Sequence, residues 1–395
     1  MHVAQAFIHD GLRWNAARAY LRPALRRPNL SRATRTQVEK ILVAGGAAAG
    51  IVAGSRTIMC GKEVILCAGA YNSPKLLMLS GIGDAGQLRR HGLDVVAHAP
   101  EVGSNLQNHP GVDVQFATRH EDSLTSQLGL PGRAALGARW LLTRKGPGAS
   151  NYFESGAFLR TRDDVAFPNM QYEFLPLTRQ LRGGRLVPVP GFQFWMDLSR
   201  PESRGAVTLR SADPADQPSI VFGHLAVRQD VRDLADGIRL ARELVRQPAW
   251  QSYRREELSP GPDVTTDAEL ETYLRSRTGT SYHASGTCRM GAGDEGVVDA
   301  EARVKAVRGL RVIDASIMPT VVRATSTRQS SRWRRRSPTG SAACRRLCPW
   351  TRPTTGQERW GPRRPGRAHP SRLLSWPSTR RRSCPACWKA PRPTC

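Results

Sequence analysis

Three short stretches of this 395-residue chain carry residue types and spacings that could do chemistry. Residues 281–291, SYHASGTCRMG, hold His283 among small side chains. Residues 309–320, GLRVIDASIMPT, place Asp314 directly after an apolar run, and residues 69–83 read GAYNSPKLLMLSGIG. An imidazole can accept a proton near neutral pH, and a strand that ends in Asp at a helix start offers backbone N–H groups to an acceptor. A lone histidine is more often a hydrogen-bonded structural residue than a catalyst, and the alternative for Asp314 is a plain helix cap.

Strands and short helices must position these stretches. Residues 63–70, EVILCAGA, are typical of a buried strand. The next segment predicts a short helix with Ser73 as N-cap and Pro74 at its first position, closed by Gly81. GGAAAG, at residues 45–50, resembles a dinucleotide-binding turn only superficially, and its context favours a hairpin turn.

The middle of the chain has a different pattern. Between residues 111 and 220, aromatic-rich runs such as MQYEFLPL and GFQFWMDL alternate with Gly and Pro turns, which predicts strands. Residues 227–248 predict an amphipathic helix, with these apolar residues on one face: Val231, Leu234, Ile238, Ala241 and Val245.

In this order and spacing, the three stretches resemble the glucose–methanol–choline (GMC) family of FAD-dependent oxidoreductases, closest to its choline-dehydrogenase-like branch. The resemblance covers roughly residues 1–322. It implies an α/β fold with an α+β substrate part, a fragment of the two-domain GMC flavoprotein. The expected divisions are a discontinuous FAD domain at 1–110 and 265–322, a substrate domain at 111–264, and a basic tail at 323–395.

The resemblance also implies roles for individual residues. His283 occupies the family's H-x-x-G-T motif, where the histidine removes the alcohol proton as hydride passes to the flavin. Asp314 and Ala315 match the segment that lines the flavin and ribityl part of FAD, and Val38 matches a position that contacts the adenine. We therefore expect FAD-dependent oxidation of a primary alcohol to the aldehyde, with oxygen or a quinone as electron acceptor.

Glu154 is the residue through which the substrate could be selected. It lies in NYFESGAF, where choline-acting relatives place a carboxylate near a trimethylammonium group. Tyr152 and Phe153 beside it could contribute cation–π contacts. A structural role for Glu154 is the open alternative.

Two departures from the family pattern affect the expected activity. No βαβ unit with a G-x-G-x-x-G turn opens the chain, although that unit holds the FAD pyrophosphate in the family. We expect an N-terminally truncated relative that binds FAD weakly, and an inactive remnant unable to hold FAD is the alternative function. After residue 322 the family's Ser-Gly-Asn continuation is replaced by arginine-rich sequence, which suggests a frameshift near residues 320–323.

The charge is concentrated in that tail. The formal net charge is +26, and residues 323–395 hold 19 of the 59 Lys and Arg but only one acid, Glu358. The other 322 residues therefore carry about +8, from the same counts. We expect a disordered out-of-frame tail. The alternative, a basic nucleic-acid-binding protein acting through this tail, would use its phosphate-binding charge and Trp stacking. No specific nucleic acid and no zinc site are expected.

Targeting and redox signals are few. No apolar run is long enough for a transmembrane helix, and the N-terminus lacks a signal-peptide core, so we expect a cytoplasmic protein. Before the tail the cysteines are Cys60, Cys67 and Cys288, too few for a disulfide framework.

Overall fold

The structure is a computed structural model that describes residues 2–3, 7–120, 124–153 and 155–322. The chain divides into two compact units, Met1–Leu347 and Cys348–Cys395, and every described residue lies in the first. The tail predicted to be disordered, 323–395, lies outside the described residues.

A first apolar core forms around helix α2 (Gly69–Leu79) and the parallel strands β7 (Val64–Leu66) and β20 (Leu310–Val312). It includes Leu77 and Val312, which are fully buried. The residues 45–50 that resemble a nucleotide turn do form a hairpin, since Gly45 and Gly46 both have positive φ. That hairpin belongs to an antiparallel sheet of β4 (Lys40–Ala44), β5 (Ala47–Ala53) and β6 (Arg56–Met59).

Helix α2 begins five residues earlier than the sequence predicts, so Ser73 is not its N-cap and Pro74 lies inside it. A proline has no N–H to bond the carbonyl four residues before it. Thr287 satisfies that carbonyl instead, because its hydroxyl donates to Ala70 O at 2.7 Å. The end is as predicted, since Gly81 follows the helix with φ +79°.

A second core lies on one face of a seven-stranded antiparallel sheet. The strand order is β1-β11-β12-β15-β10-β18, with β19 also paired to β10. Its strands are β1 (His2–Val3), β10 (Pro110–Thr118), β11 (Ser155–Leu159), β12 (Met170–Leu175), β15 (Gly191–Leu198), β18 (Arg254–Ser259) and β19 (Gly279–Thr280).

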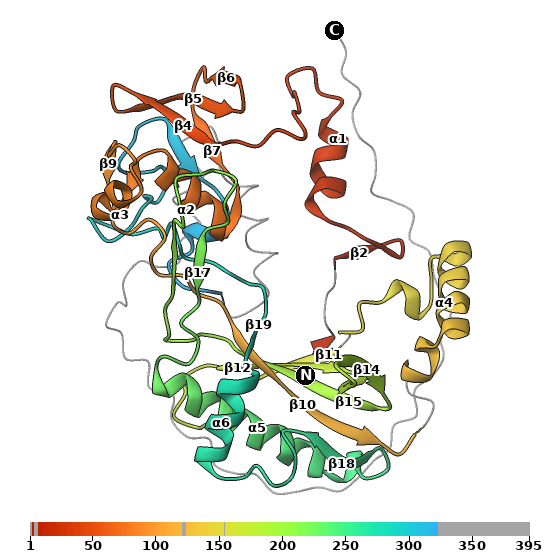
Figure 1. The fold of residues 1–395 in the computed structure, drawn as a ribbon. Helices are drawn as coiled ribbons and strands as arrows, with labels where there is room; N and C mark the ends of the chain where they lie inside the picture. The colour runs from red at the N-terminus through yellow and green to blue at the C-terminus, as the bar shows by residue number, and fades with distance from the viewer. Residues whose placement is uncertain (1, 4–6, 121–123, 154, 323–395) are drawn as a thin grey trace, which may run out of the picture. The chain divides into compact units, whose positions relative to one another are not determined.

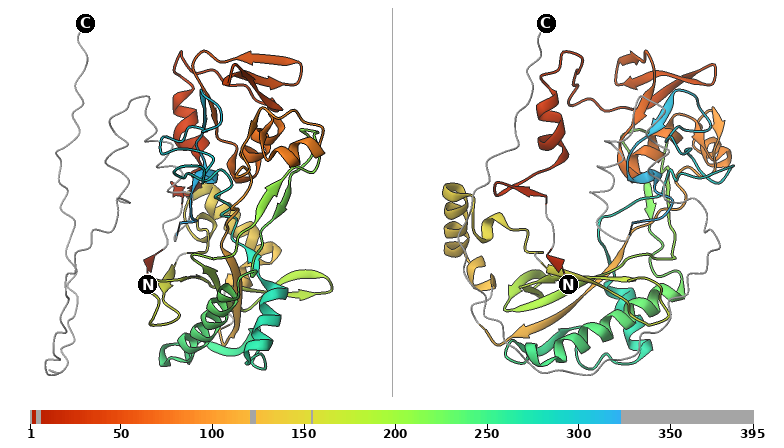
Figure 2. Two further views of the ribbon diagram at one scale, coloured as in Figure 1. Left: turned by 90° about the vertical axis from the view of Figure 1, so that its left-hand side faces the viewer. Right: turned by 180° about the vertical axis from the view of Figure 1, so that it is seen from behind.

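Helices α5 (Arg228–Arg246) and α6 (Asp267–Arg277) pack on the apolar face of this sheet (Figures 1 and 2). The five residues predicted to share one face of α5 are all buried. Leu270 and Leu274 place α6 in this second core, although the predicted division assigned 265–322 to the FAD domain. The division into domains therefore stays a prediction, and we propose that its second boundary lies after α6.

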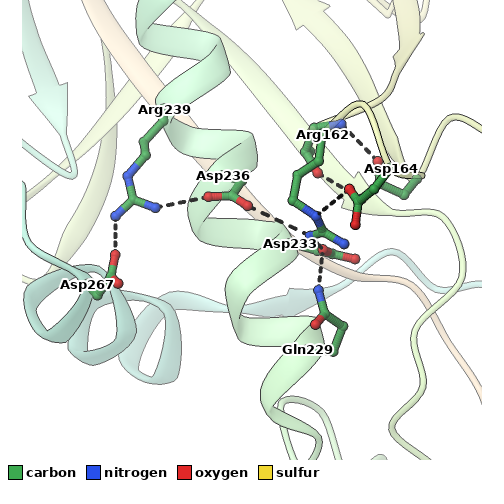
Figure 3. Close-up of polar contacts among 9 residues, drawn as sticks. Arg162, Asp164, Gln229, Asp233, Asp236, Arg239 and Asp267 are labelled. Atoms are coloured by element: carbon green, nitrogen blue, oxygen red, sulfur yellow. Dashed lines mark hydrogen bonds and ion pairs between the residues drawn. The ribbon is translucent and has the colours of Figure 1, made fainter.

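Charged side chains also fasten α5 to its surroundings (Figure 3). Arg239 pairs with Asp236 at 3.0 Å and with Asp267, the first residue of α6. Arg162 pairs with Asp164 at 3.0 Å and with Asp233 of α5. A less exposed pair joins Arg242 of α5 to Glu257 of β18 at 2.8 Å.

The remaining elements are short or peripheral. Three are hairpins: β2 (Ile8–His9) with β3 (Leu12–Arg13), β13 (Thr178–Arg182) with β14 (Arg185–Val189), and β16 (Ala206–Thr208) with β17 (Ser219–Val221). Strands β8 (Ile82–Gly83) and β9 (Ala97–His98) form a parallel pair, and the further α-helices are α1 (Arg22–Ala24), α3 (Ala85–Arg90) and α4 (Leu130–Thr143). The single turns are η1 (Ala17–Leu21), η2 (Leu124–Leu128), η3 (Pro147–Ala149), η4 (Pro248–Trp250) and η5 (Ala315–Ile317). Within the described ranges, no helix is both long and apolar enough to cross a bilayer.

Candidate active site

His283 lies on the segment that follows β19, and Asn108 fixes its backbone. The Asn108 side-chain oxygen accepts the N–H of His283 and the N–H of His109, each at 2.9 Å. Asn108 is 2% exposed, so its amide is a rigid anchor between the start of β10 and the segment that carries His283. The sequence analysis did not single out Asn108, because a lone Asn before a strand has no distinctive spacing.

Two imidazoles meet at this point. The rings of His109 and His283 pack edge to face with centroids 5.3 Å apart. Nδ1 of His109 donates to Leu198 O at 2.9 Å, since a carbonyl can only accept, and this fixes the neutral tautomer with its lone pair on Nε2. Nε2 of His109 and Nδ1 of His283 are buried and have no hydrogen-bond partner among the described residues.

Burial keeps both histidines neutral. It lowers the pKa of His283 to about 4, and the neighbouring His109 lowers it further in the same direction. Burial also lowers the pKa of His109, although backbone carbonyls oppose that shift. At neutral pH His283 therefore holds a free lone pair, which is the form that a proton acceptor requires.

The Asp314 carboxylate connects the start of α2 to η5 through three hydrogen bonds, an arrangement that we call the Asp314 latch. Its side chain accepts from Gly69 N at 2.9 Å, Ser73 Oγ at 2.5 Å and Ser316 N at 2.8 Å. The carboxylate is 5% exposed. Because its oxygens already accept these three bonds, the side chain organises the surrounding backbone, as in the helix-cap interpretation of the sequence.

The structure places the segment that carries His283 beside the segment that carries Asp314 and Ala315. The strand-like segment after His283 runs along η5, where Gly286 N donates to Ala315 O at 3.2 Å and Cys288 N to Ser316 O at 2.8 Å. Val38 is not part of this cluster. It lies just before β4, whose Ile41 N donates to Ser80 Oγ at the far end of α2. Eleven helical residues separate the two ends of α2, a length of roughly 16 Å.

The face of the sheet opposite to α5 is unusually polar. Antiparallel register places Asp197 beside Gly111 and Gln171, and Trp195 beside Glu173. The carboxylate of Asp197 accepts from Trp195 Nε1 at 2.7 Å and from Ser281 Oγ, two residues before His283. Burial raises the pKa of Asp197 to about 7; the Ser281 hydrogen bond opposes that shift and the charge of Glu173 adds to it. Burial also raises the pKa of Glu173.

Strand alternation could have revealed this polar face. In GFQFWMDL every second residue from Phe192 is apolar and faces α5, so Gln193, Trp195 and Asp197 must face the other side. Gly111 allows this packing, because a Cβ there would lie 2.7 Å from the Trp195 ring and 2.4 Å from Asp197 Oδ1.

A glycine-rich phosphate turn is not recognisable at the two places where the sequence spells G-x-G-x-x-G. Residues 81–86 follow helix α2, whereas a pyrophosphate turn follows a strand. Asp84 also caps the six-residue helix α3 by accepting from Gln87 N at 2.8 Å, and a carboxylate there repels phosphate. Residues 291–296 lead into no helix.

Other candidates contribute less. Glu154 lies outside the described residues, so its predicted role stays a prediction. Cys288 is fully buried, and burial raises its thiol pKa, which makes it a poor nucleophile.

Among the described residues no three His, Cys, Asp or Glu side chains gather as metal ligands. Two surface hollows, of about 510 and 440 Å³, lie away from His283 and are lined by charged residues around Arg119 and Arg162.

Comparisons with known proteins place this arrangement in a family. The N-terminal model of the GMC oxidoreductases matches residues 1–111, and the C-terminal model matches residues 201–328. The oxygen-dependent choline dehydrogenase of Brucella anthropi is 45% identical over 320 residues, which is 80% of this chain and 58% of that protein. The enzyme of the same name from Ectopseudomonas mendocina is 42% identical, covering 79% of this chain and 56% of its own. The chain thus spans somewhat over half the length of these curated relatives.

Solved structures agree at the level of the fold. Formate oxidase of Aspergillus oryzae superposes with a TM-score of 0.76 at 24% identity, covering 82% of this chain and 62% of its own. Pyridoxine 4-oxidase of Mesorbium loti gives a TM-score of 0.69 at 26% identity, over 83% and 62% of the two chains. The mixed parallel and antiparallel architecture described above is therefore a partial GMC fold, and the chain belongs to the GMC oxidoreductase family.

Proposed function

We propose that this chain carries the catalytic side of an FAD-dependent oxidoreductase that oxidises the CH–OH group of an alcohol to the aldehyde. The observation that carries the proposal is a neutral His283 with a buried, unpartnered ring nitrogen. Asn108 holds it next to the segment that contains Asp314 and Ala315. Family membership, through relatives named choline dehydrogenase and a structural neighbour named pyridoxine 4-oxidase, supports the same reaction class.

The residues present fit one end of the cofactor. Backbone around Ala315, ordered by the Asp314 latch, would border the flavin and ribityl end, and the backbone near Val38 would border the adenine. These two places lie at opposite ends of α2, so separate segments of the chain would hold the two ends of the cofactor. No turn suited to the pyrophosphate is found among the described residues. FAD, when bound, supplies the acceptor for the two electrons and the hydrogen that leave the alcohol carbon as hydride.

The contribution of the chain itself is proton acceptance and orientation. His283 takes the hydroxyl proton on a ring nitrogen while the C–H bond breaks. Asn108 fixes the approach of the ring, and His109 excludes water from one of its edges. The pKa of about 4 keeps His283 unprotonated at neutral pH, but it also makes the ring a weaker base than a free imidazole, so its efficiency as a proton acceptor depends on how it is positioned.

We propose further that the alcohol carries a cationic group, as choline does. The polar sheet face supports this, since Asp197 and Glu173 are partly or fully buried carboxyl groups beside the Trp195 ring. Carboxylates and an aromatic face are the groups that attract a quaternary ammonium. Glu154 remains a second proposed carboxylate for the same cation.

Anaerobic reduction of the FAD-loaded chain tests the proposal. Adding choline to the wild-type chain should bleach the flavin band, whereas His283→Gln should slow bleaching by about 10²–10⁴-fold. His120→Gln is the matched control, because His120 is exposed and lies at the other end of β10. Equal rates for the wild type and His283→Gln would overturn the assignment of the base. Equal bleaching by a neutral alcohol of the same size would overturn the cationic substrate alone.

A further inference from the structure

Helix α4 exposes an apolar stripe. No residue of this 14-residue helix is buried, and its largest apolar side chains are strongly exposed: Leu130 at 82%, Leu141 at 63% and Leu142 at 85%. Residues 130, 134, 138 and 141 follow helical spacing, so Ala134 and Ala138 complete the stripe. The other side of the helix is anchored, since Trp140 Nε1 donates to Gly11 O at 2.7 Å. Three outward leucines on one helix are more than scattered surface residues require.

The charged residues along this helix are all cationic. Residues 124–153 contain Arg133, Arg139, Arg144 and Lys145 and no Asp or Glu. All four are exposed, and none forms an ion pair within the part of the chain that the structure describes. The Arg144 guanidinium lies 4.3 Å from the centre of the Trp140 ring, at the end of the helix.

The hairpin β2–β3 extends the same surface. Its turn packs against the end of α4, because a Cβ on Gly11 would lie 2.1 Å from the carbonyl oxygen of Arg144, the residue that follows this helix. Phe7, beside the hairpin, is 46% exposed, and Ile8 of β2 is 37% exposed. The hairpin turn holds one exposed acid, Asp10, which pairs with His9 at 3.4 Å, whereas residues 11–38 contain seven arginines and no Asp or Glu. Two segments far apart in the chain thus combine exposed apolar side chains with positive charge.

We propose that α4 and the β2–β3 hairpin form a docking surface for an anionic lipid bilayer. Leucine side chains enter the boundary between headgroups and acyl chains, and long arginine stems bring their guanidinium groups to lipid phosphates. Each basic residue near an anionic leaflet adds attraction that salt weakens. The helix is about 21 Å long, shorter than the roughly 30 Å hydrocarbon core, so it lies in the interface plane.

Vesicle co-sedimentation of the full chain tests this surface. Vesicles of phosphatidylcholine with about one third phosphatidylglycerol should sediment the wild-type chain, and pure phosphatidylcholine should sediment much less. The variant Leu141→Glu/Leu142→Glu should lower the partition coefficient about tenfold or more, because it removes the apolar part of the contact. Circular dichroism should be unchanged, since neither side chain packs inside the protein.

The matched control is Met59→Glu/Val221→Glu. It makes the same change in charge at two residues that are 66% and 60% exposed and lie outside α4. The control should sediment like the wild type. Equal losses in both double variants would show adsorption by net charge, including that of the arginine-rich tail, and would overturn the proposal. Lipid-independent self-association abolished only by the α4 variant would overturn it in favour of a second copy of the chain. Binding to duplex DNA in place of vesicles would overturn it in favour of nucleic acid.

Discussion

At the scale of single residues, the proposed reaction depends on His283 and Asp197, which the short segment 281–283 connects. Ser281 hydrogen-bonds Asp197, and His283 follows two residues later. A change in the charge of Asp197 therefore alters the electrostatic potential close to His283, the proposed proton acceptor. Because the pKa of Asp197 is raised to about 7, its charge changes within the pH range in which most enzymes are assayed.

The apparent affinity for a cationic alcohol should depend on the charge of Asp197. Below about pH 7 the carboxyl group is protonated and attracts the cation less, so KM for choline should rise as pH falls through 7. A neutral alcohol should show no such rise, and Asp197→Asn should remove it. The measurement is KM between about pH 5.5 and 8.5 for both alcohols. A parallel change for both would contradict a role of Asp197 in binding the cation.

The sequence motifs predict which residues are candidates for the site, but they do not contain the tertiary contacts that set the properties of those residues. The motif predicted His283, yet not its low pKa, because that shift arises from burial and from His109, 174 positions earlier in the sequence (283 − 109). Strand alternation predicts that Asp197 and Trp195 lie on the same face of their strand, but only the folded structure shows that this face meets Ser281. The predicted roles of Val38, Asp314, Ala315 and Glu154 remain predictions.

At the scale of elements, α2 owes its position to side chains distant in sequence. The Asp314 carboxylate binds its first turn, and Thr287 fills the hydrogen bond that Pro74 leaves open. Sequence analysis predicted a helix that started at Ser73, because Ser followed by Pro is a common start signal. These two tertiary contacts extend the helix by more than one turn at its N-terminus. The local sequence cannot predict them, because Thr287 and Asp314 lie more than 200 residues away.

Replacing Asp314 should therefore destabilise the fold more than replacing an ordinary cap. Asp314→Asn turns one accepting oxygen into a donor that faces N–H groups, so we expect a loss of about 1.5–3 kcal/mol. The control is Asp84→Asn at the N-cap of α3, where Asn caps almost as well and the loss should stay within about 0.5 kcal/mol. Urea denaturation provides both values. Equal losses would contradict the latch.

The ion pairs around α5 differ in burial and should differ in strength. Arg242 and Glu257 have side chains 11% and 10% exposed, so Arg242→Gln should cost about 3–5 kcal/mol by leaving a carboxylate without its partner. Arg239 of the network in Figure 3 is 42% exposed, and Arg239→Gln should cost about 1 kcal/mol or less. Thermal unfolding of the two variants gives the comparison. A larger loss from Arg239→Gln would contradict this order.

At the scale of the whole molecule, the described residues form two apolar cores, one around α2 and one on the seven-stranded sheet. The long, strongly periodic α5 was predictable residue by residue, because its apolar face repeats at helical spacing. The assignment of α6 was not, since its two buried leucines do not reveal which core they join. The half-exposed side chain of Ile65, at 48%, marks β7 as a strand whose outer surface is incompletely covered.

The central claim is that this chain holds FAD beside His283. The most direct test is the visible absorption spectrum of the full chain at dialysis equilibrium with excess FAD, measured against the dialysate. Because the described residues offer no pyrophosphate turn, our account predicts weak binding, seen as a protein-bound flavin band that is lost in step with the native circular dichroism on heating. A chain with native circular dichroism and no bound flavin would contradict the account, and would favour a GMC remnant that keeps part of the family's fold without its cofactor.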